Sequence, residues 1–202
     1  MHEEKFAKAT EALRHDHRVI EKVLAVLEGL TRSREPSLGQ WDKAVDFLRG
    51  FADRCHHLKE EKILFPALEE RGVPRAGGPI GSMVAEHDEG RGYVQVMAAA
   101  LALAKEDPEA ALPALIENGR AYLRLLKDHI RKEEEVLFKL ADELLTPGEQ
   151  RKLLREFEEH EAGEMGAGTH EAYLKAAEEL AARRSKSWLP HIDREPPLLP
   201  GC

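Results

Sequence analysis

Two ten-residue stretches decide the fold: residues 56–65, HHLKEEKILF, and residues 129–138, HIRKEEEVLF. Aligned on Leu-Phe, both read His-x-x-Lys-Glu-Glu-x-(Ile/Val)-Leu-Phe. Residues four apart share one face of a helix, so each copy directs an imidazole and a carboxylate the same way, one turn apart. Two such pairs facing each other inside a helical bundle would form a metal site.

The composition of the 202-residue chain is typical of a helical protein. Charged residues make up 34% and aromatic residues 5%, and β-branched runs are absent. The net charge of −8 argues against nucleic acid and against an anionic membrane surface as main partners. There is no signal-peptide core, no apolar run near the roughly 20 residues that span a bilayer, and no disulfide framework. These features predict a cytoplasmic protein.

Apolar periodicity predicts four long helices, at about residues 3–32, 38–71, 80–105 and 108–145. Pro108 and Pro113 are alternative starts for the fourth helix. A capping box at Thr146 opens a helical extension over residues 146–184, and a proline-rich, extended tail is expected at 185–202. We therefore expect a bundle domain over residues 1–145, followed by these two segments.

The chain also repeats at a larger scale. His17 precedes His56 by 39 residues, and His87 precedes His129 by 42 residues. Each half is thus a helical hairpin that carries one lone histidine and then one His-x-x-x-Glu motif. Two similar hairpins pack most simply as an all-α, up-down-up-down four-helix bundle with a C-terminal helical extension.

This repeat places four imidazoles and two carboxylates at one level of the bundle interior. Without partners, their burial would cost several kcal/mol in total. If both carboxylates bridge, two metals would each receive two nitrogens and two oxygens, which suits iron better than zinc and leaves about two positions free on an octahedral ion. One position could hold a bridging group, the other a diatomic ligand or peroxide. The predicted metal ligands are His17, His56, Glu60, His87, His129 and Glu133.

Two alternatives stay open at this point. A hydrogen-bonded polar core could replace the metal. His57 and Glu61 also form an i, i+4 pair, rotated by about 100° from His56 and Glu60. Alignment favours the pair of His56 and Glu60, so replacement of His57 is expected to leave bound iron in place. Glu61 and Glu134 are expected at the surface or orienting a ligating histidine.

The other candidates carry weaker signals. Cys55 follows an apolar stretch and is expected to be a small core residue, and Cys202 an inert exposed thiol. No regular spacing supports a second metal site at His160, Glu161 and His170, which flank glycine-rich turns and are expected at the surface.

The motifs together resemble the hemerythrin-like (HHE) cation-binding family over about residues 5–145. The resemblance implies a non-haem di-iron centre, oxo- or hydroxo-bridged, in a four-helix bundle. Ferritin-like proteins differ, because they use Glu-x-x-His rather than His-x-x-x-Glu. The resemblance is carried by Asp16-His17-Arg18, by His56-x-x-x-Glu60-Glu61 with Leu64-Phe65-Pro66, by Glu86-His87 with Gly90-Arg91, and by His129-x-x-x-Glu133-Glu134 with Leu137-Phe138.

The sequence departs from the oxygen-carrying hemerythrins in the third helix. Their pattern there is similar to His-x-x-x-His, whereas the residue four after His87 is Arg91. A permanent cation is a poor metal ligand, so one iron should be more open unless Tyr122 fills the gap. Tyr122 lies seven residues before His129 on the same helix face.

Three functions follow, in order of preference. The first is a di-iron protein that binds or senses O2, NO or peroxide, or handles iron itself. The second is an enzyme, a peroxidase or an NO- or O2-reducing protein, working at the open iron position. The third is an interaction module with a structural metal, in which the C-terminal extension docks a protein partner or a second copy of the chain.

Overall fold

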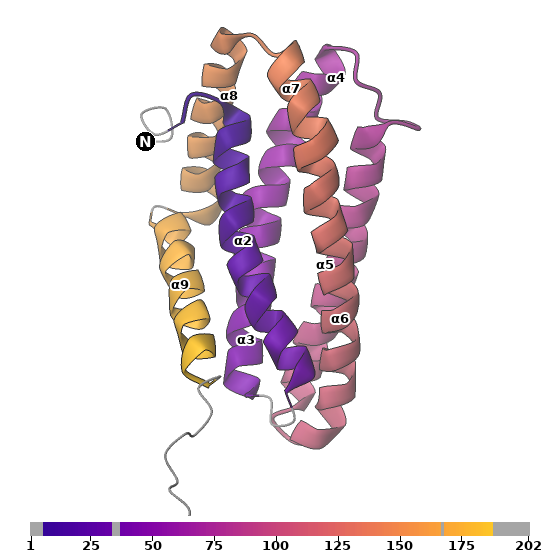
Figure 1. The fold of residues 1–202 in the computed structure, drawn as a ribbon, viewed down its shortest axis with the longest axis vertical. Helices are drawn as coiled ribbons and strands as arrows, with labels where there is room; N and C mark the ends of the chain where they lie inside the picture. The colour runs from indigo at the N-terminus through magenta and orange to yellow at the C-terminus, as the bar shows by residue number, and fades with distance from the viewer. Residues whose placement is uncertain (1–5, 34–36, 167, 188–202) are drawn as a thin grey trace, which may run out of the picture.

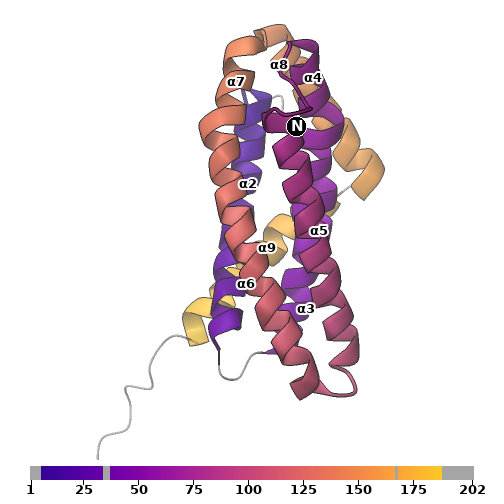
Figure 2. The ribbon, with the colours of Figure 1, turned by 90° about the vertical axis from the view of Figure 1, so that its right-hand side faces the viewer.

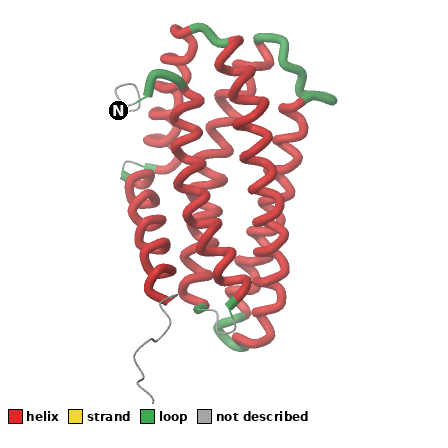
Figure 3. The backbone as a smooth tube through the Cα atoms, in the orientation of Figure 1, coloured by secondary structure: helices red, strands yellow, loops and turns green. Residues whose placement is uncertain are grey.

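A computed structural model describes residues 6–33, 37–166 and 168–187. Over these ranges the chain is helical apart from short connections, and they contain no strand (Figure 3). The loops that join the long helices lie at the two ends of the molecule, as Figure 3 shows. The predicted all-α class is confirmed.

Four long helical rods, each made of one or more consecutive helical segments, build the bundle. The first two rods form the first hairpin. Rod one is α2 (Ala9–Arg32). Rod two runs without a break in the helical path through α3, two π-helical segments and α4. Its segments are α3 (Leu38–Phe47), η1 (Leu48–His57), η2 (Glu60–Leu64) and α4 (Phe65–Glu70).

The second hairpin repeats this plan. Rod three is α5 (Pro79–Leu103), and rod four contains α6 (Pro108–Lys132), η3 (Glu133–Leu137) and α7 (Phe138–Leu144). Figures 1 and 2 show the four rods side by side, with successive rods running in opposite directions. The structure therefore confirms the up-down-up-down four-helix bundle.

Capping residues explain where two helices begin. The Asp107 carboxylate accepts a hydrogen bond from the Ala110 N–H at 3.1 Å, and Pro108 occupies the first turn, where a missing N–H costs nothing. Pro113 therefore lies inside α6, and the alternative start there is wrong. The predicted capping box is present as well, because Thr146 Oγ1 accepts from the Glu149 N–H and Glu149 accepts from the Thr146 N–H at 2.8 Å.

The π-helical segments were not predicted. η2 begins at Glu60 and η3 begins at Glu133, which are matching positions of the sequence repeat. A π-helix bonds i to i+5, so it is wider than an α-helix and successive side chains are separated by a smaller angle. Such segments are rare and occur frequently at functional sites. Here they lie where rods two and four carry the repeated His-x-x-x-Glu pattern.

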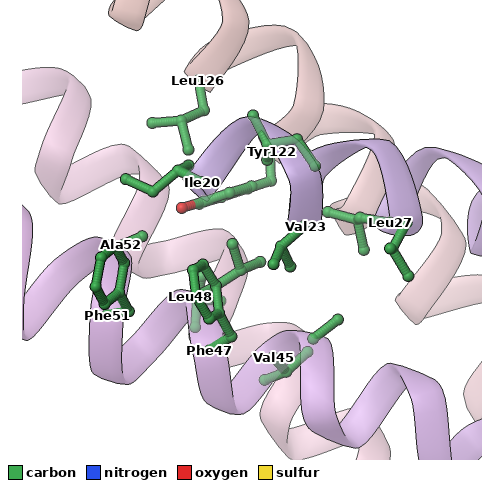
Figure 4. Packing of buried hydrophobic residues seen from close by; sticks show 14 of the residues in the cluster. Ile20, Val23, Leu27, Val45, Phe47, Leu48, Phe51, Ala52, Tyr122 and Leu126 are labelled. Atoms are coloured by element: carbon green, nitrogen blue, oxygen red, sulfur yellow. The ribbon is translucent and has the colours of Figure 1, made fainter. Parts of the chain in front are cut away.

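Buried apolar side chains form two clusters along the bundle. One contains Ile20, Phe51 and Tyr122; the other contains Leu13, Phe65 and Phe138, among others. Figure 4 shows part of the first cluster, where residues of α2, η1 and α6 converge. The predicted ligands fall between these clusters along each rod: His17, for example, lies between Leu13 and Ile20. A polar layer thus divides an otherwise apolar core.

The extension consists of α8 (Pro147–His160), η4 (Glu161–Met165) and α9 (Thr169–Ser187). In Figure 1 it runs along the outside of the bundle beside α2. Phe157 belongs to the same apolar cluster as Leu13, and Leu180 to the same cluster as Ile20. The extension is therefore packed into both halves of the core. Within the described ranges, no helix has both the length and the apolar character needed to cross a bilayer.

Candidate metal centre

All six predicted ligands meet in the polar layer, and each is no more than 1% exposed. Every rod contributes at least one of them. They are His17 on α2, His56 on η1, Glu60 on η2, His87 on α5, His129 on α6 and Glu133 on η3.

The four histidines form two pairs, His17 with His56 and His87 with His129, and the two carboxylates lie between the pairs. Glu60 Oε1 lies 3.5 Å from His56 Nε2, and Glu60 Oε2 lies 3.5 Å from His87 Nε2. Glu133 Oε2 lies 3.2 Å from His17 Nε2, and Glu133 Oε1 lies 3.2 Å from His129 Nε2. Each glutamate thus offers one oxygen to each pair.

The outer nitrogen of each histidine faces a carboxylate. The Nδ1 to oxygen distances are 3.1 Å for His17, 3.4 Å for His56, 2.7 Å for His87 and 3.0 Å for His129. An Nδ1–H that donates to a carboxylate leaves the Nε2 lone pair directed inward, which is the usual arrangement of metal-ligating histidines. The accepting residues are Glu134, Asp16, Glu61 and Glu86, respectively.

Two of these four acceptors, Glu61 and Glu134, were expected either at the surface or orienting a ligating histidine, and each faces the Nδ1 of a histidine in the layer. Asp16 and Glu86 were missed in that role. The available signal was that an acidic residue directly precedes the lone histidine in each half. What the sequence did not indicate is that Asp16 and Glu86 serve the histidine of another rod.

The buried charges in the layer depend on one another. Burial disfavours ionised Glu133, but the neighbouring imidazoles of His129 and His17 override it and hold the pKa of Glu133 well below its usual range. Burial disfavours charged His129, but Glu133 and then Glu86 raise its pKa to about 9. Burial and the charge of Glu133 raise the pKa of Glu60 well above its usual range. The layer therefore balances its carboxylates with positive charge.

Several buried polar atoms of the layer have no hydrogen-bond partner. They include Nε2 of His17 and His56 and both carboxylate oxygens of Glu60 and Glu133. Buried polar groups are nearly always satisfied, and leaving one unsatisfied costs about 1–3 kcal/mol. These six atoms are among the inward-facing potential ligand atoms of the two His/Glu groups, which also include Nε2 of His87 and His129. Nitrogen and oxygen donors converging in this way fit divalent metal ions.

His57 lies inside the same layer, so the expectation that it lies rotated away from the site is wrong. It is buried, and its ring stacks on His87 with centroids 4.0 Å apart. Both candidate histidines of rod two therefore point into the interior. His56 faces Glu60, and His57 faces His87. The physical reason is the π-helical backbone of η1, which brings adjacent side chains closer in angle than an α-helix does.

Arg91, at the position of the missing fifth histidine, binds carboxylates beside the metal layer. Its Nη2 donates to Glu61 at 2.6 Å and its Nε to Asp53 at 2.8 Å. Tyr122 is buried and, with His57 and Arg91, lines a cavity of about 190 Å³. Figure 4 shows the Tyr122 ring reaching from α6 into the bundle interior.

The residues flanking the glycine-rich turns correct another expectation. His160 and His170 are buried rather than at the surface, because η4 and α9 pack on η1. His160 Nε2 donates to the Arg54 carbonyl at 3.1 Å. Cys55 is buried as predicted, and burial raises the pKa of its thiol to about 12.

A second group of potential ligands lies where η1 meets the extension. It consists of Cys55, Glu161 and His170. The ammonium of Lys59 already provides the cation there. It donates to Glu161 at 2.8 Å and to Asp16 at 2.6 Å. Burial disfavours the charged amine, but Asp16 overrides it and raises the pKa of Lys59.

Comparison with known proteins agrees with this geometry. Residues 8–141 match the Hemerythrin HHE cation binding domain. The match covers the bundle from the start of α2 to within three residues of the end of α7, so the chain belongs to the hemerythrin HHE cation-binding family, a family of metal-binding proteins.

Similar proteins of other organisms are distant in sequence. Uncharacterized protein Rv1995 of Mycobacterium tuberculosis is 26% identical over 178 residues, which cover 84% of this chain and 68% of that protein. Iron-sulfur cluster repair protein YtfE of Escherichia coli K12 is 35% identical over 85 residues, 41% of this chain and 39% of that protein. No solved structure matches the chain.

Proposed function

We propose that this protein is a non-haem di-iron protein whose centre binds or senses a small oxidant or diatomic molecule. One observation carries the proposal: Glu60 and Glu133 each direct one oxygen to His17 and His56 and the other to His87 and His129. A carboxylate shared in this way is suited to bridge two ions. The proposed ligands are therefore the six residues predicted from the sequence.

The donor set supports iron as the metal. Two imidazole nitrogens and two carboxylate oxygens for each ion suit iron, whereas structural zinc prefers four-coordinate sites rich in sulfur and nitrogen. Two dications would also balance the buried carboxylates of Glu60 and Glu133. Bound iron would supply redox chemistry and free coordination positions for O2, NO or peroxide. Membership of a cation-binding family supports the same reading.

The surrounding residues hold the histidines for this task. Each Nδ1–H is directed to a carboxylate, which selects the tautomer with Nε2 free and makes the ring a stronger donor. The apolar clusters on both sides keep the layer dry and strengthen its electrostatic interactions. The cavity beside His57 and Tyr122 supports access for a small molecule.

Metal analysis of the protein purified without added metal tests the proposal. We expect about two irons per chain and visible charge-transfer bands that change on reduction and on exposure to air. Replacing His129 or Glu133 by Ala should lose iron and colour. His15→Ala is the matched control, because His15 lies on α2 beside His17 but packs against Phe6. The proposal would be contradicted if the purified protein held zinc, or if protein from cells grown in iron-rich medium were folded but held no iron.

An enzyme is the second candidate, because the cavity extends to the metal layer. Steady-state consumption of peroxide or NO by the iron-loaded protein would favour this candidate over a carrier or sensor. The likeness of 85 residues to the iron-sulfur cluster repair protein YtfE favours iron handling as a third candidate. Transfer of iron to a chelator on reduction, without turnover of small oxidants, would favour that role.

A further inference from the structure

The inference concerns His57, which the proposed six-residue ligand set leaves out. The ring of His57 lies parallel to that of His87, at an interplanar angle of 10°, and its centroid is 5.6 Å from that of His129. One ring nitrogen from each of these three histidines lies within 4.8 Å of the other two. Such a grouping is compact enough for one ion to contact all three.

His57 is also the one histidine of the layer with neither ring nitrogen satisfied. It is 3% exposed, and both Nδ1 and Nε2 lack a hydrogen-bond partner. In the other four histidines, Nδ1 faces a carboxylate within 3.4 Å. Burying an imidazole in this way is costly unless something outside the protein chain binds it.

Asp53 stands where an orienting carboxylate for His57 would be needed. Its Oδ1 lies 3.7 Å from His57 Nδ1, one turn earlier on rod two. Arg91 holds that same oxygen at 2.8 Å and, through Glu61, also supports His87. The residue that replaces the expected fifth histidine of α5 therefore braces the carboxylates behind His57 and His87.

We propose that His57 is a fifth imidazole ligand of the metal centre, bound to the ion shared by His87 and His129. This inference rests on the proposed function. The two ions would then be unequal, with three nitrogens and two oxygens on one side and two nitrogens and two oxygens on the other. The fifth histidine comes from η1 instead of α5, and the more open ion is the one held by His17 and His56.

The competing role for His57 is a hydrogen bond to a molecule in the adjoining cavity, without contact to metal. His57→Ala and His57→Gln separate the two roles, since Gln retains much of the volume and a hydrogen-bonding group. X-ray absorption of the iron-loaded proteins counts imidazoles, and anaerobic Fe(II) titration against a chelator measures affinity. Far-UV circular dichroism checks that each variant is folded.

We expect both variants to lose imidazole scattering and at least about tenfold in affinity for one of the two irons. Mössbauer spectra of the 57Fe-loaded protein should change mainly for one of two distinct sites. Added imidazole should restore the spectrum of His57→Ala, because the cavity of about 190 Å³ adjoins the deleted ring. His15→Ala should change none of these measurements.

An unchanged imidazole count and unchanged iron affinity in folded His57→Ala would overturn the inference. So would a loss of small-ligand binding alone, with the Mössbauer spectrum intact. Wild-type protein that binds no pair of irons would instead refute the proposed function, so the two failures can be told apart.

Discussion

At the scale of single residues, the centre depends as much on the carboxylates behind the histidines as on the ligands. Glu134 accepts from His17 Nδ1 at 3.1 Å and from Arg18 at 2.9 Å. Its neighbour Glu135 is exposed and pairs only with Arg131 among the ion pairs of the described chain. The two adjacent glutamates therefore offer a matched test.

We expect Glu134→Ala to lower iron affinity by about 10- to 100-fold, because His17 loses the group that fixes its tautomer and orientation. Glu135→Ala should leave the affinity unchanged. Anaerobic Fe(II) titration of both variants measures the difference. Equal affinities for the two would show that the orienting carboxylate is dispensable.

Adjacent residues of the ligand motif show what local sequence could predict. The spacing of His56 and Glu60 predicted that both side chains share one face, and the structure brings them together. The burial of His57 could not be read in the same way, because a 100° step per residue places it off that face in an α-helix. Only the π-helical backbone of η1 admits both histidines.

At the scale of helices, close approach is set by small residues at specific contacts. Gly119 on α6 faces the buried Trp41 ring on α3, and a Cβ there would lie 2.8 Å from the ring and 3.0 Å from Thr31. Gly92 on α5 is exposed, and a Cβ added there would have no neighbouring atom within 4 Å. The same substitution should therefore have opposite effects at the two sites.

We expect Gly119→Ala to lower the free energy of unfolding by about 1–3 kcal/mol, because the rigid indole must shift. Gly92→Ala should raise it by about 0.5–1 kcal/mol, since alanine restricts the unfolded chain and favours a helix. Urea denaturation followed by circular dichroism measures both. Stabilisation by Gly119→Ala would mean that α3 and α6 are not in close contact.

At the scale of the whole molecule, we propose that the extension is an integral part of the bundle domain. Phe157 on α8 is fully buried in the cluster of Leu13, and the ammonium of Lys59 lies 5.5 Å from its ring centroid. Lys59 also joins Glu161 of η4 to Asp16, which in turn faces His56. The extension thus reaches the metal layer through one chain of polar contacts.

We expect Phe157→Ala to cost about 3–5 kcal/mol of unfolding free energy, the usual range for a buried phenylalanine. Leu103→Ala, at a side chain that is 67% exposed, should change stability by less than about 0.5 kcal/mol. Thermal and chemical denaturation of the two variants give the comparison. A cost near that of Leu103→Ala would identify the extension as a loosely attached appendage.

The helical class, the two hairpins and the six side chains that lie together at their centre could all be predicted from the sequence alone. This prediction was possible because the two copies of the i, i+4 motif lie on apolar helix faces. There are few ways to bury both apolar faces without also bringing the two motifs together. The sequence could not place the groups whose positions depend on other rods. Three placements depend on packing between distant segments and on local π-helical backbone: Asp16 faces His56, His57 stacks on His87, and His170 of the extension packs against Phe51 of η1. The tertiary structure decided those contacts, because backbone width and the approach of neighbouring rods fix where a side chain points.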